Sequence, residues 1–163
     1  MKNKQTAYNG YNFRSRTEAR WAVFFDNLKI RYLYEYEDFM VEGTRYLPDF
    51  FLPDLLPGGC FAEVKHRFKS SESALCFSLC ELTGSPVILL EDIPDLEPTP
   101  VFVMEYGEPV HYNGVIGGAG RKGIWFEPPV YDETVFCQDF RDAVWAARQA
   151  RFEFGETPVV KRA

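Results

Sequence analysis

The segment that decides the fold is residues 45–66, RYLPDFFLPDLLPGGCFAEVKH. Both of its ends carry the aromatic and apolar residues that favour β-structure, so residues 45–52 and 60–66 are predicted to be strands. The Pro-Gly-Gly sequence at 57–59 is typical of a turn between them. We therefore expect these two strands to form an antiparallel hairpin.

Three charged side chains of this hairpin are expected to lie close together. The two-residue period of the second strand places Glu63 and Lys65 on the same face, about 7 Å apart at a rise of roughly 3.3 Å per residue. In the first strand, Pro48 cannot donate a ladder hydrogen bond, which suits a strand that bends or ends at this point. Hairpin pairing then brings Asp49, the next residue, close to the Glu63 and Lys65 pair.

An amphipathic helix is predicted before the hairpin, over residues 15–29. Its apolar face includes Trp21 and Phe25, which recur with Glu18 at steps of three and four residues. Ser15 and Glu18 also form the S-x-x-E pattern of a capping box, and capping is the alternative role for this glutamate. If the apolar face turns toward the sheet, the Glu18 carboxylate needs a lysine or a bound cation as its partner.

The remaining sequence predicts further strands and helices of an α/β protein with a mixed sheet flanked by helices. We expect one domain, with a core over about residues 8–91 and a C-terminal extension over about 92–163. The Gly84 that follows residues 71–83 is placed as a helix cap, and a right-handed crossover should make the strand at 86–90 parallel to the one at 60–66. The expected elements are strands at 31–43, 86–90, 101–106 and 123–128, helices at 71–83 and 134–154, and an irregular glycine-rich connection at 114–123.

The charge distribution limits how this protein could hold nucleic acid. The formal net charge is -6 and the pI is near 5.0, so any contact with DNA must be local. Residues 1–31 contain seven basic and two acidic residues, whereas residues 91–108 contain six acidic and no basic residues. Solvated surface charge is the alternative interpretation of each basic cluster. The candidate DNA-binding residues are Arg14, Arg16, His66, Arg67, Lys69, Arg121 and Lys122.

The sequence has no apolar run of the length that a membrane span requires, and residues 1–10 have no apolar stretch of the kind found in signal peptides. We therefore expect a soluble, cytoplasmic protein without a membrane partner. None of the four cysteines forms a CxxC pair, and we expect reduced, packed thiols.

The order of the charged motifs resembles the PD-(D/E)XK nuclease superfamily, in particular its small phage and bacterial members. The motifs are Glu18 in YNFRSRTEARWAVFFDNLKIRYLYEYE, Asp49 in YLPDFFLP, and Glu63 and Lys65 in FAEVKH. The resemblance implies a restriction-endonuclease-like core, with a helix, three strands, a helix and a strand. It also implies that Asp49 and Glu63 ligate Mg²⁺ or Mn²⁺ and that Glu18 completes or supports the metal shell. Lys65 would orient or deprotonate the attacking water, or stabilise the charge that develops on the phosphate.

These patterns predict a metal-dependent DNA endonuclease from a bacterial or phage-infected cell. The alternative is a catalytically inactive nuclease-like fold that binds DNA or protein, for example as an inhibitory, anti-defence module. The sequence leaves open whether the substrate is DNA or RNA and whether one metal ion or two would act. A homodimer and a monomeric nickase are both compatible with it.

Overall fold

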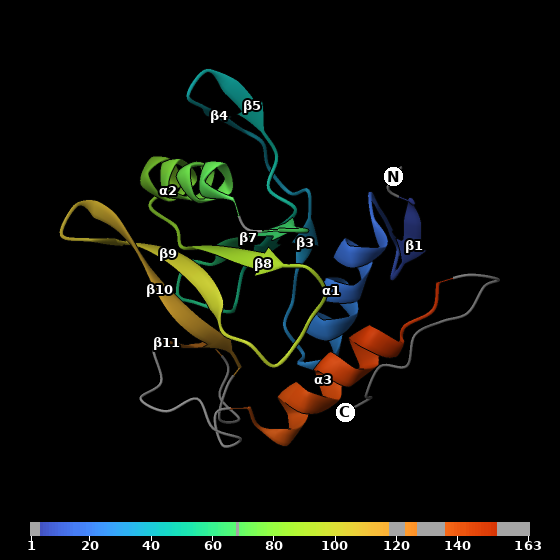
Figure 1. Ribbon diagram of the computed structural model, residues 1–163. Coiled ribbons are helices and arrows are strands. Elements are labelled where there is room, and N and C mark those ends of the chain that lie inside the picture. The colour runs from blue at the N-terminus through green and yellow to red at the C-terminus, as the bar shows by residue number, and fades with distance from the viewer. Residues whose placement is uncertain (1–3, 68, 118–122, 127–135, 153–163) are drawn as a thin grey trace.

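The computed structural model describes residues 4–67, 69–117, 123–126 and 136–152. Its centre is a mixed sheet of seven strands in the order β11-β10-β9-β8-β7-β6-β3, with two small hairpins beside it. The expected α/β class is confirmed (Figure 1). The elements are β1 (Thr6–Tyr8), β2 (Tyr11–Phe13), α1 (Arg16–Asn27), β3 (Leu33–Tyr34), β4 (Phe39–Val41), β5 (Thr44–Tyr46), β6 (Phe50–Leu52), β7 (Cys60–Lys65), α2 (Ser70–Thr83), β8 (Val87–Glu91), β9 (Thr99–Glu105), β10 (Glu108–Ile116), β11 (Ile124–Phe126) and α3 (Gln138–Gln149).

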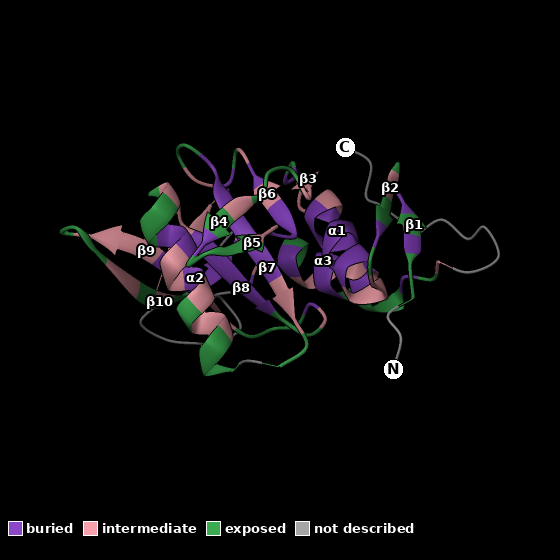
Figure 2. Cartoon of the chain, turned by 90° about the horizontal axis from the view of Figure 1, so that it is seen from above, coloured by how far each residue is buried: buried purple, intermediate pink, exposed green. Residues whose placement is uncertain are grey.

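Helices cover both faces of the central sheet. Figure 1 shows α2 on one face and α1 with α3 on the other. Alternate residues of β8 separate the two cores, because Leu89 belongs to the cluster under α2, whereas Ile88 and Leu90 belong to the cluster under α1 and α3. All three side chains are fully buried. The central strands β7 and β8 are accordingly among the most buried parts of the chain in Figure 2.

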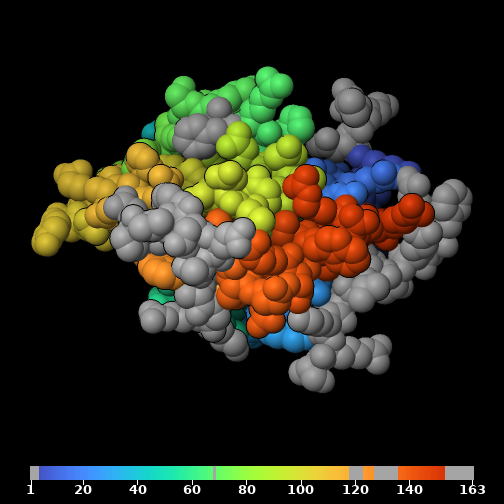
Figure 3. Space-filling model, turned by 60° about the horizontal axis from the view of Figure 1, so that its bottom comes forward, coloured from blue at the N-terminus to red at the C-terminus, as the bar shows by residue number. Residues whose placement is uncertain are grey.

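The third helix fixes the position of the first. Figure 3 shows α3 lying across one face of the molecule, with only small parts of α1 visible beside it. Phe24 and Phe140 meet edge to face with ring centroids 5.2 Å apart. The Arg20 guanidinium donates hydrogen bonds to the backbone oxygens of Ala147 and Arg148, at 2.7 and 2.9 Å, near the C-terminal end of α3. The last carbonyls of a helix have few backbone donors, and Arg20 joins the two helices by donating to these two; Ala147 O otherwise accepts only a long bond of 3.4 Å from the Ala150 N–H among the described residues.

The predicted hairpin and crossover are both confirmed. Strand β6 pairs antiparallel with β7, with Phe50 opposite Ala62, and β7 pairs parallel with β8. Helix α2 forms the crossover and ends at Gly84, whose φ of 69° lies in the left-handed region expected of a glycine cap. The helix predicted over 15–29 is α1, and the Ser15 side chain caps it by accepting from the Glu18 backbone N–H.

Two predicted strands are wrong because each is divided into two pieces. Residues 45–52 form β5 and β6, and 47–49 lie between them without strand hydrogen bonding. Residues 31–43 form β3 and β4, separated where Glu35 adopts a φ of 49°. Pro48 has no N–H for a ladder and a positive φ is incompatible with a strand, which explains why neither segment is continuous. Strands β4 and β5 instead pair with each other, forming a hairpin that projects beyond α2 in Figure 1.

The residues after 91 extend the central sheet, and they form more regular structure than their proline- and glycine-rich composition predicts. The prediction that residues 114–123 are irregular is wrong for 114–116, which belong to the nine-residue strand β10. Gly114 suits this strand because a Cβ there would lie 2.6 Å from the Ile124 side chain on β11. The strands predicted at 101–106 and 123–128 are β9 and β11, and the closing helix is shorter than predicted. Residues 134, 135, 153 and 154, at its predicted ends, lie outside the described residues. In the described part of the chain, no helix has the length and apolar character needed to cross a membrane.

Candidate active site

A cleft of about 590 Å³ opens where three separate parts of the chain meet. They are the start of α1, the break between β5 and β6, and the end of β7. This cleft contains all four residues that the sequence motifs singled out. The residues that line it are Arg14, Glu18, Arg45, Tyr46, Leu47, Asp49, Glu63, Val64, Lys65 and His66.

Asp49 is held in the cleft by the backbone of the neighbouring strand. It is 3% exposed, and its Oδ2 accepts a hydrogen bond of 2.8 Å from the Val64 N–H, while its Oδ1 accepts one of 2.9 Å from Arg14. Burial raises the pKa of Asp49 well above its usual range, and the charges of Glu63 and Glu18 raise it further. Val64 and Arg14 oppose this rise only in part. The three carboxylates are thus close enough to act on one another electrostatically.

Glu63 and Lys65 form an ion pair on one face of β7, as their alternation predicts. Lys65 Nζ lies 2.9 Å from Glu63 Oε1, and Glu63 is 4% exposed. Burial lowers the pKa of Lys65, but the charges of Glu63 and Asp49 outweigh this effect and the pKa is raised overall. Lys65 is therefore an ammonium group at neutral pH in this structure, a form suited to stabilising phosphate charge rather than to deprotonating water.

Glu18 faces the cleft from the first turn of α1. Its Oε2 accepts a 2.5 Å hydrogen bond from the Tyr34 hydroxyl, and its Oε1 accepts one of 3.1 Å from Ser15 Oγ. The predicted capping by Ser15 is present, and the glutamate side chain reaches the serine hydroxyl. The Glu18 carboxylate thus contacts the hydroxyl of the capping serine while it faces the cleft, and only the Ser15 half of the capping box is observed in the part of the chain that the structure describes.

The six oxygens of these three carboxylates all have partners. Ser15 and Tyr34 contact Glu18, Arg14 and the Val64 N–H contact Asp49, and Lys65 and the Asp49 N–H contact Glu63. In the described part of the chain, no three Asp, Glu, His or Cys side chains are arranged as a preformed ligand group. Mg²⁺ takes hard oxygen ligands and is often bound by one or two carboxylates with several waters, so the neighbouring Asp49 and Glu63 suit it chemically.

Comparisons with known proteins do not identify a family. No family model, curated protein or solved structure matches this chain. Because a fold by itself does not determine function, any assignment depends on the chemistry of the cleft.

The predicted DNA-binding residues are not gathered in one place. Arg14 lies in the cleft, where its guanidinium contacts Glu35 at 2.6 Å as well as Asp49. Arg16 begins α1 at the same end, and Lys69 is exposed just before α2. Arg121 and Lys122 lie outside the described residues.

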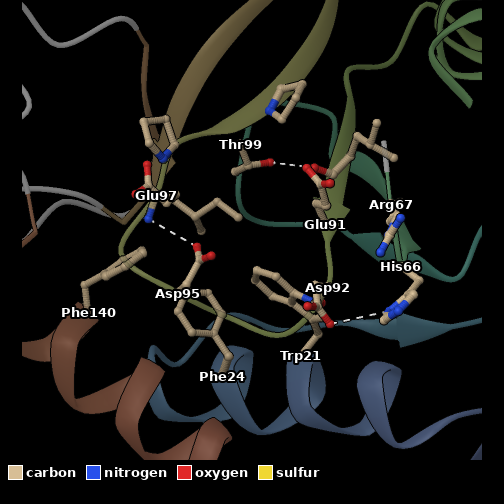
Figure 4. A pocket seen from close by; sticks show the side chains of 14 residues that line it. Trp21, Phe24, His66, Arg67, Glu91, Asp92, Asp95, Glu97, Thr99 and Phe140 are labelled. Atoms are coloured by element: carbon tan, nitrogen blue, oxygen red, sulfur yellow. Dashed lines mark hydrogen bonds and ion pairs between the residues drawn. The ribbon is translucent and has the colours of Figure 1, made fainter. Parts of the chain in front are cut away.

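His66 lines the cleft and also lines a second cavity, which it shares with Arg67. This cavity, of about 640 Å³, has an aromatic floor that includes Trp21 and Phe24 (Figure 4). His66 Nδ1 lies 3.6 Å from Asp92 Oδ1. Four acidic side chains also line this cavity, which makes it a poor surface for a nucleic-acid backbone. They are Glu91, Asp92, Asp95 and Glu97.

Four residues that line the cleft were missed in the sequence, namely Arg45, Tyr46, Leu47 and Val64. Tyr34 was missed as well; it lies outside the lining and donates a hydrogen bond to Glu18 from β3. Arg45 is exposed and pairs with Asp38. Arg45 and Tyr46 could have been found from the sequence, because they lie within four residues of Asp49 and enter the cleft with it. The directions of their side chains depend on the break at Pro48, which the predicted continuous strand over 45–52 did not include.

Proposed function

We propose that this protein is a metal-dependent DNA endonuclease that hydrolyses phosphodiester bonds. The observation that carries the proposal is that Glu18, Asp49 and Glu63, from three separate segments, line one cleft beside the Lys65 ammonium. The buried carboxylates lie close enough together that the Asp49 pKa is raised by both of the others. A strongly perturbed acid in a cleft with two further buried carboxylates and a lysine is characteristic of catalytic sites. The motif order resembling the PD-(D/E)XK superfamily, and the restriction-endonuclease-like core that it implies, support the same proposal.

Each residue of the cleft has a distinct part in this proposal. Asp49 and Glu63 would hold Mg²⁺ or Mn²⁺, and Glu18, positioned by Tyr34, would support the shell. When bound, the ion would supply Lewis-acid stabilisation and lower the pKa of a nucleophilic water. Lys65 would direct its positive charge at the developing phosphate oxyanion. Arg14, which is half exposed at the mouth of the cleft, would contact the backbone phosphates of the strand.

The experiment that tests the proposal is cleavage of linear, nicked, single-stranded and branched DNA in Mg²⁺, Mn²⁺ or EDTA. We expect metal-dependent cleavage that falls by at least about a hundredfold in Glu63→Gln and in Lys65→Ala. Glu81→Gln is the matched control, because Glu81 is an exposed carboxylate on α2 outside the cleft. Cleavage that is insensitive to both cleft substitutions would refute the proposal. An RNA strand in the same panel distinguishes the two nucleic acids.

A second candidate function is a nuclease-like binding or inhibitory module without catalysis. It is favoured by the complete pairing of the carboxylate oxygens, because Arg14 and Lys65 already neutralise Asp49 and Glu63. Isothermal titration with Mn²⁺ separates the two functions. Binding that is lost in Asp49→Asn supports the endonuclease, whereas the absence of any binding that depends on Asp49 and Glu63 supports the module.

A further inference from the structure

Tyr46 places a buried hydroxyl at the cleft without giving it a partner. It is the last residue of β5, in the hairpin that projects beside α2, and it lines the cleft together with Asp49 and Glu63. Burial contributes most to the raised pKa of Tyr46, and Glu63 raises it further through its charge and a side-chain contact at hydrogen-bonding range. Nevertheless, within the described residues the hydroxyl makes no hydrogen bond of acceptable geometry. Unpaired buried hydroxyls are uncommon in folded proteins, and each one calls for an explanation.

The surrounding acceptors are already engaged. Both oxygens of Glu63 have donors, one from Lys65 and one from the Asp49 N–H, and both oxygens of Asp49 have donors as well. Both oxygens of Glu18 also have donors, from Ser15 and Tyr34, and the cations of the cleft offer the hydroxyl no acceptor. Tyr46 therefore has a buried O–H that could donate to a group that enters the cleft and displaces the side chains covering it.

The charges of the cleft indicate which kind of group that would be. Arg14, Arg45 and Lys65 bring three positive charges to the walls of the cleft, where they balance the charges of Glu18, Asp49 and Glu63. A group that enters beside these cations and takes the O–H as its donor is best matched by an anionic oxygen acceptor. The cavity lined by His66 and Arg67 has no such balance, since four carboxylates line it against one guanidinium. The charge pattern thus directs an anion to the cleft that Tyr46 lines.

We propose that the Tyr46 hydroxyl donates a hydrogen bond to a non-bridging phosphate oxygen of a bound nucleic-acid strand. This inference rests on the proposed nuclease function and adds to it a substrate-binding residue on the β4–β5 hairpin. The hairpin would then form part of the substrate-binding surface, and its small separate sheet would be stabilised by the strand that it contacts. A hydroxyl that is unpaired in the free protein would gain its partner in the complex.

The test compares Tyr46→Phe with Tyr36→Phe, which removes a hydroxyl from a tyrosine that is 57% exposed and lies outside the lining of the cleft. Equilibrium binding to a short fluorescent duplex is measured in EDTA, where no metal-dependent cleavage occurs, and kcat and KM are measured in Mg²⁺. We expect Tyr46→Phe to weaken binding about tenfold, which corresponds to about 1.4 kcal/mol, and to raise KM more than it lowers kcat. Its urea midpoint should equal or exceed that of the unaltered protein, because removing an unpaired hydroxyl loses no hydrogen bond. Tyr36→Phe should leave binding and KM unchanged.

A ligand-side measurement identifies the atom that is contacted. On a duplex with neutral methylphosphonate linkages, the unaltered protein and Tyr46→Phe should bind with equal affinity. If Tyr46→Phe lowers the urea midpoint and leaves DNA binding unchanged, the hydroxyl has a structural partner and the inference is wrong. If Glu63→Gln abolishes cleavage while Tyr46→Phe alters neither binding nor KM, the inference fails and the proposed function stands. A protein that neither binds nor cuts DNA would overturn both.

Discussion

The side chain of Asp49 accepts a hydrogen bond from the backbone N–H of Val64, at 2.8 Å, across the hairpin that joins β6 to β7. In return, the Asp49 N–H donates to Glu63 Oε2 at 3.3 Å. Two acidic residues that repel each other are thus held together by backbone hydrogen bonds. The hairpin holds Asp49 and Glu63 in place, so the free energy gained by folding the sheet, and not a bound ligand, offsets their repulsion.

Replacing Asp49 by Asn should make the metal-free protein more stable at neutral pH. The substitution keeps an oxygen for the Val64 N–H and removes a buried negative charge beside Glu63. The pKa of Asp49 is higher in the folded protein than in the unfolded chain, where it is about 3.9. The stability contributed by protonated Asp49 is therefore fully present below about pH 3.9 and is lost as the pH rises toward the folded pKa. Across that window the difference between the two proteins should grow by up to about 1.4 kcal/mol per pH unit. Urea unfolding in EDTA from pH 4 to 8 measures it.

The control for this prediction is Asp95→Asn. Partial desolvation of its carboxyl raises the pKa of Asp95 as well, but the residue as a whole is exposed, and it lines the acidic cavity instead of the cleft. Its effect on stability should be within about 0.5 kcal/mol, as is usual for surface positions. A stability difference for Asp49→Asn that does not change with pH would contradict the raised pKa.

Replacing Tyr34 by Phe should destabilise the protein, in contrast to the outcome expected at Tyr46. The Tyr34 hydroxyl donates to the buried Glu18 carboxylate at 2.5 Å and accepts from the Arg14 backbone N–H at 3.0 Å. Loss of a hydrogen bond to a charged group costs about 1.5 to 3 kcal/mol. We expect the free energy of unfolding to fall by about 2 kcal/mol in a urea titration. An unchanged midpoint would show that Glu18 finds another donor.

Replacing Gly59 by Ala should disrupt the hairpin that carries Asp49 and Glu63. Gly59 has a φ of 80°, and a Cβ there would lie 2.5 Å from the Phe51 ring and 3.2 Å from the Pro53 backbone. Both the conformation and the contact oppose a side chain, so we expect a loss of about 2 kcal/mol or more. Gly58→Ala is the matched control, because its φ is 79° but nothing lies within 4 Å of its added Cβ. Thermal unfolding should show a smaller loss for Gly58→Ala, and equal losses would assign the whole effect to backbone strain.

The sequence predicted the parts of the fold that follow from periodicity. The step of three and four residues identified α1, and the alternation in β7 correctly placed Glu63 and Lys65 on one face. The same alternation failed at 31–43 and 45–52, because Glu35 and Pro48 interrupt strands that otherwise have suitable composition. Strand β10 was missed in part because Gly114 has low β propensity, yet it suits a close approach to Ile124 that exists only in the folded sheet.

The sequence predicted which charged residues form the candidate site but not which hydrogen-bond partners hold them. The order of the motifs identified four residues that all line the cleft. The partners of those residues come from segments whose approach depends on tertiary structure. Tyr34, for example, reaches Glu18 across 16 residues, and Arg14 reaches Asp49 across 35. A hydrogen-bond partner across such a separation has no signature in the local sequence.

Replacing Arg14 by Gln should tighten metal binding while weakening DNA binding. The Arg14 guanidinium contacts Asp49 at 2.9 Å and Glu35 at 2.6 Å, so a cation that approaches Asp49 must compete with it. The Arg14 side chain is 53% exposed, which makes this ion pair weak enough for a divalent ion to displace. Removing this competitor should lower the Mn²⁺ dissociation constant by about three- to tenfold in isothermal titration, equivalent to about 0.6 to 1.4 kcal/mol. The loss of one phosphate contact should weaken DNA binding and reduce its salt dependence by about one ion.

The control for Arg14→Gln is Arg31→Gln, which removes an exposed ion pair with Asp54 outside the lining of the cleft and should change neither Mn²⁺ binding nor DNA binding. If Arg14→Gln instead weakens Mn²⁺ binding, Arg14 positions Asp49 for the metal and does not compete with it.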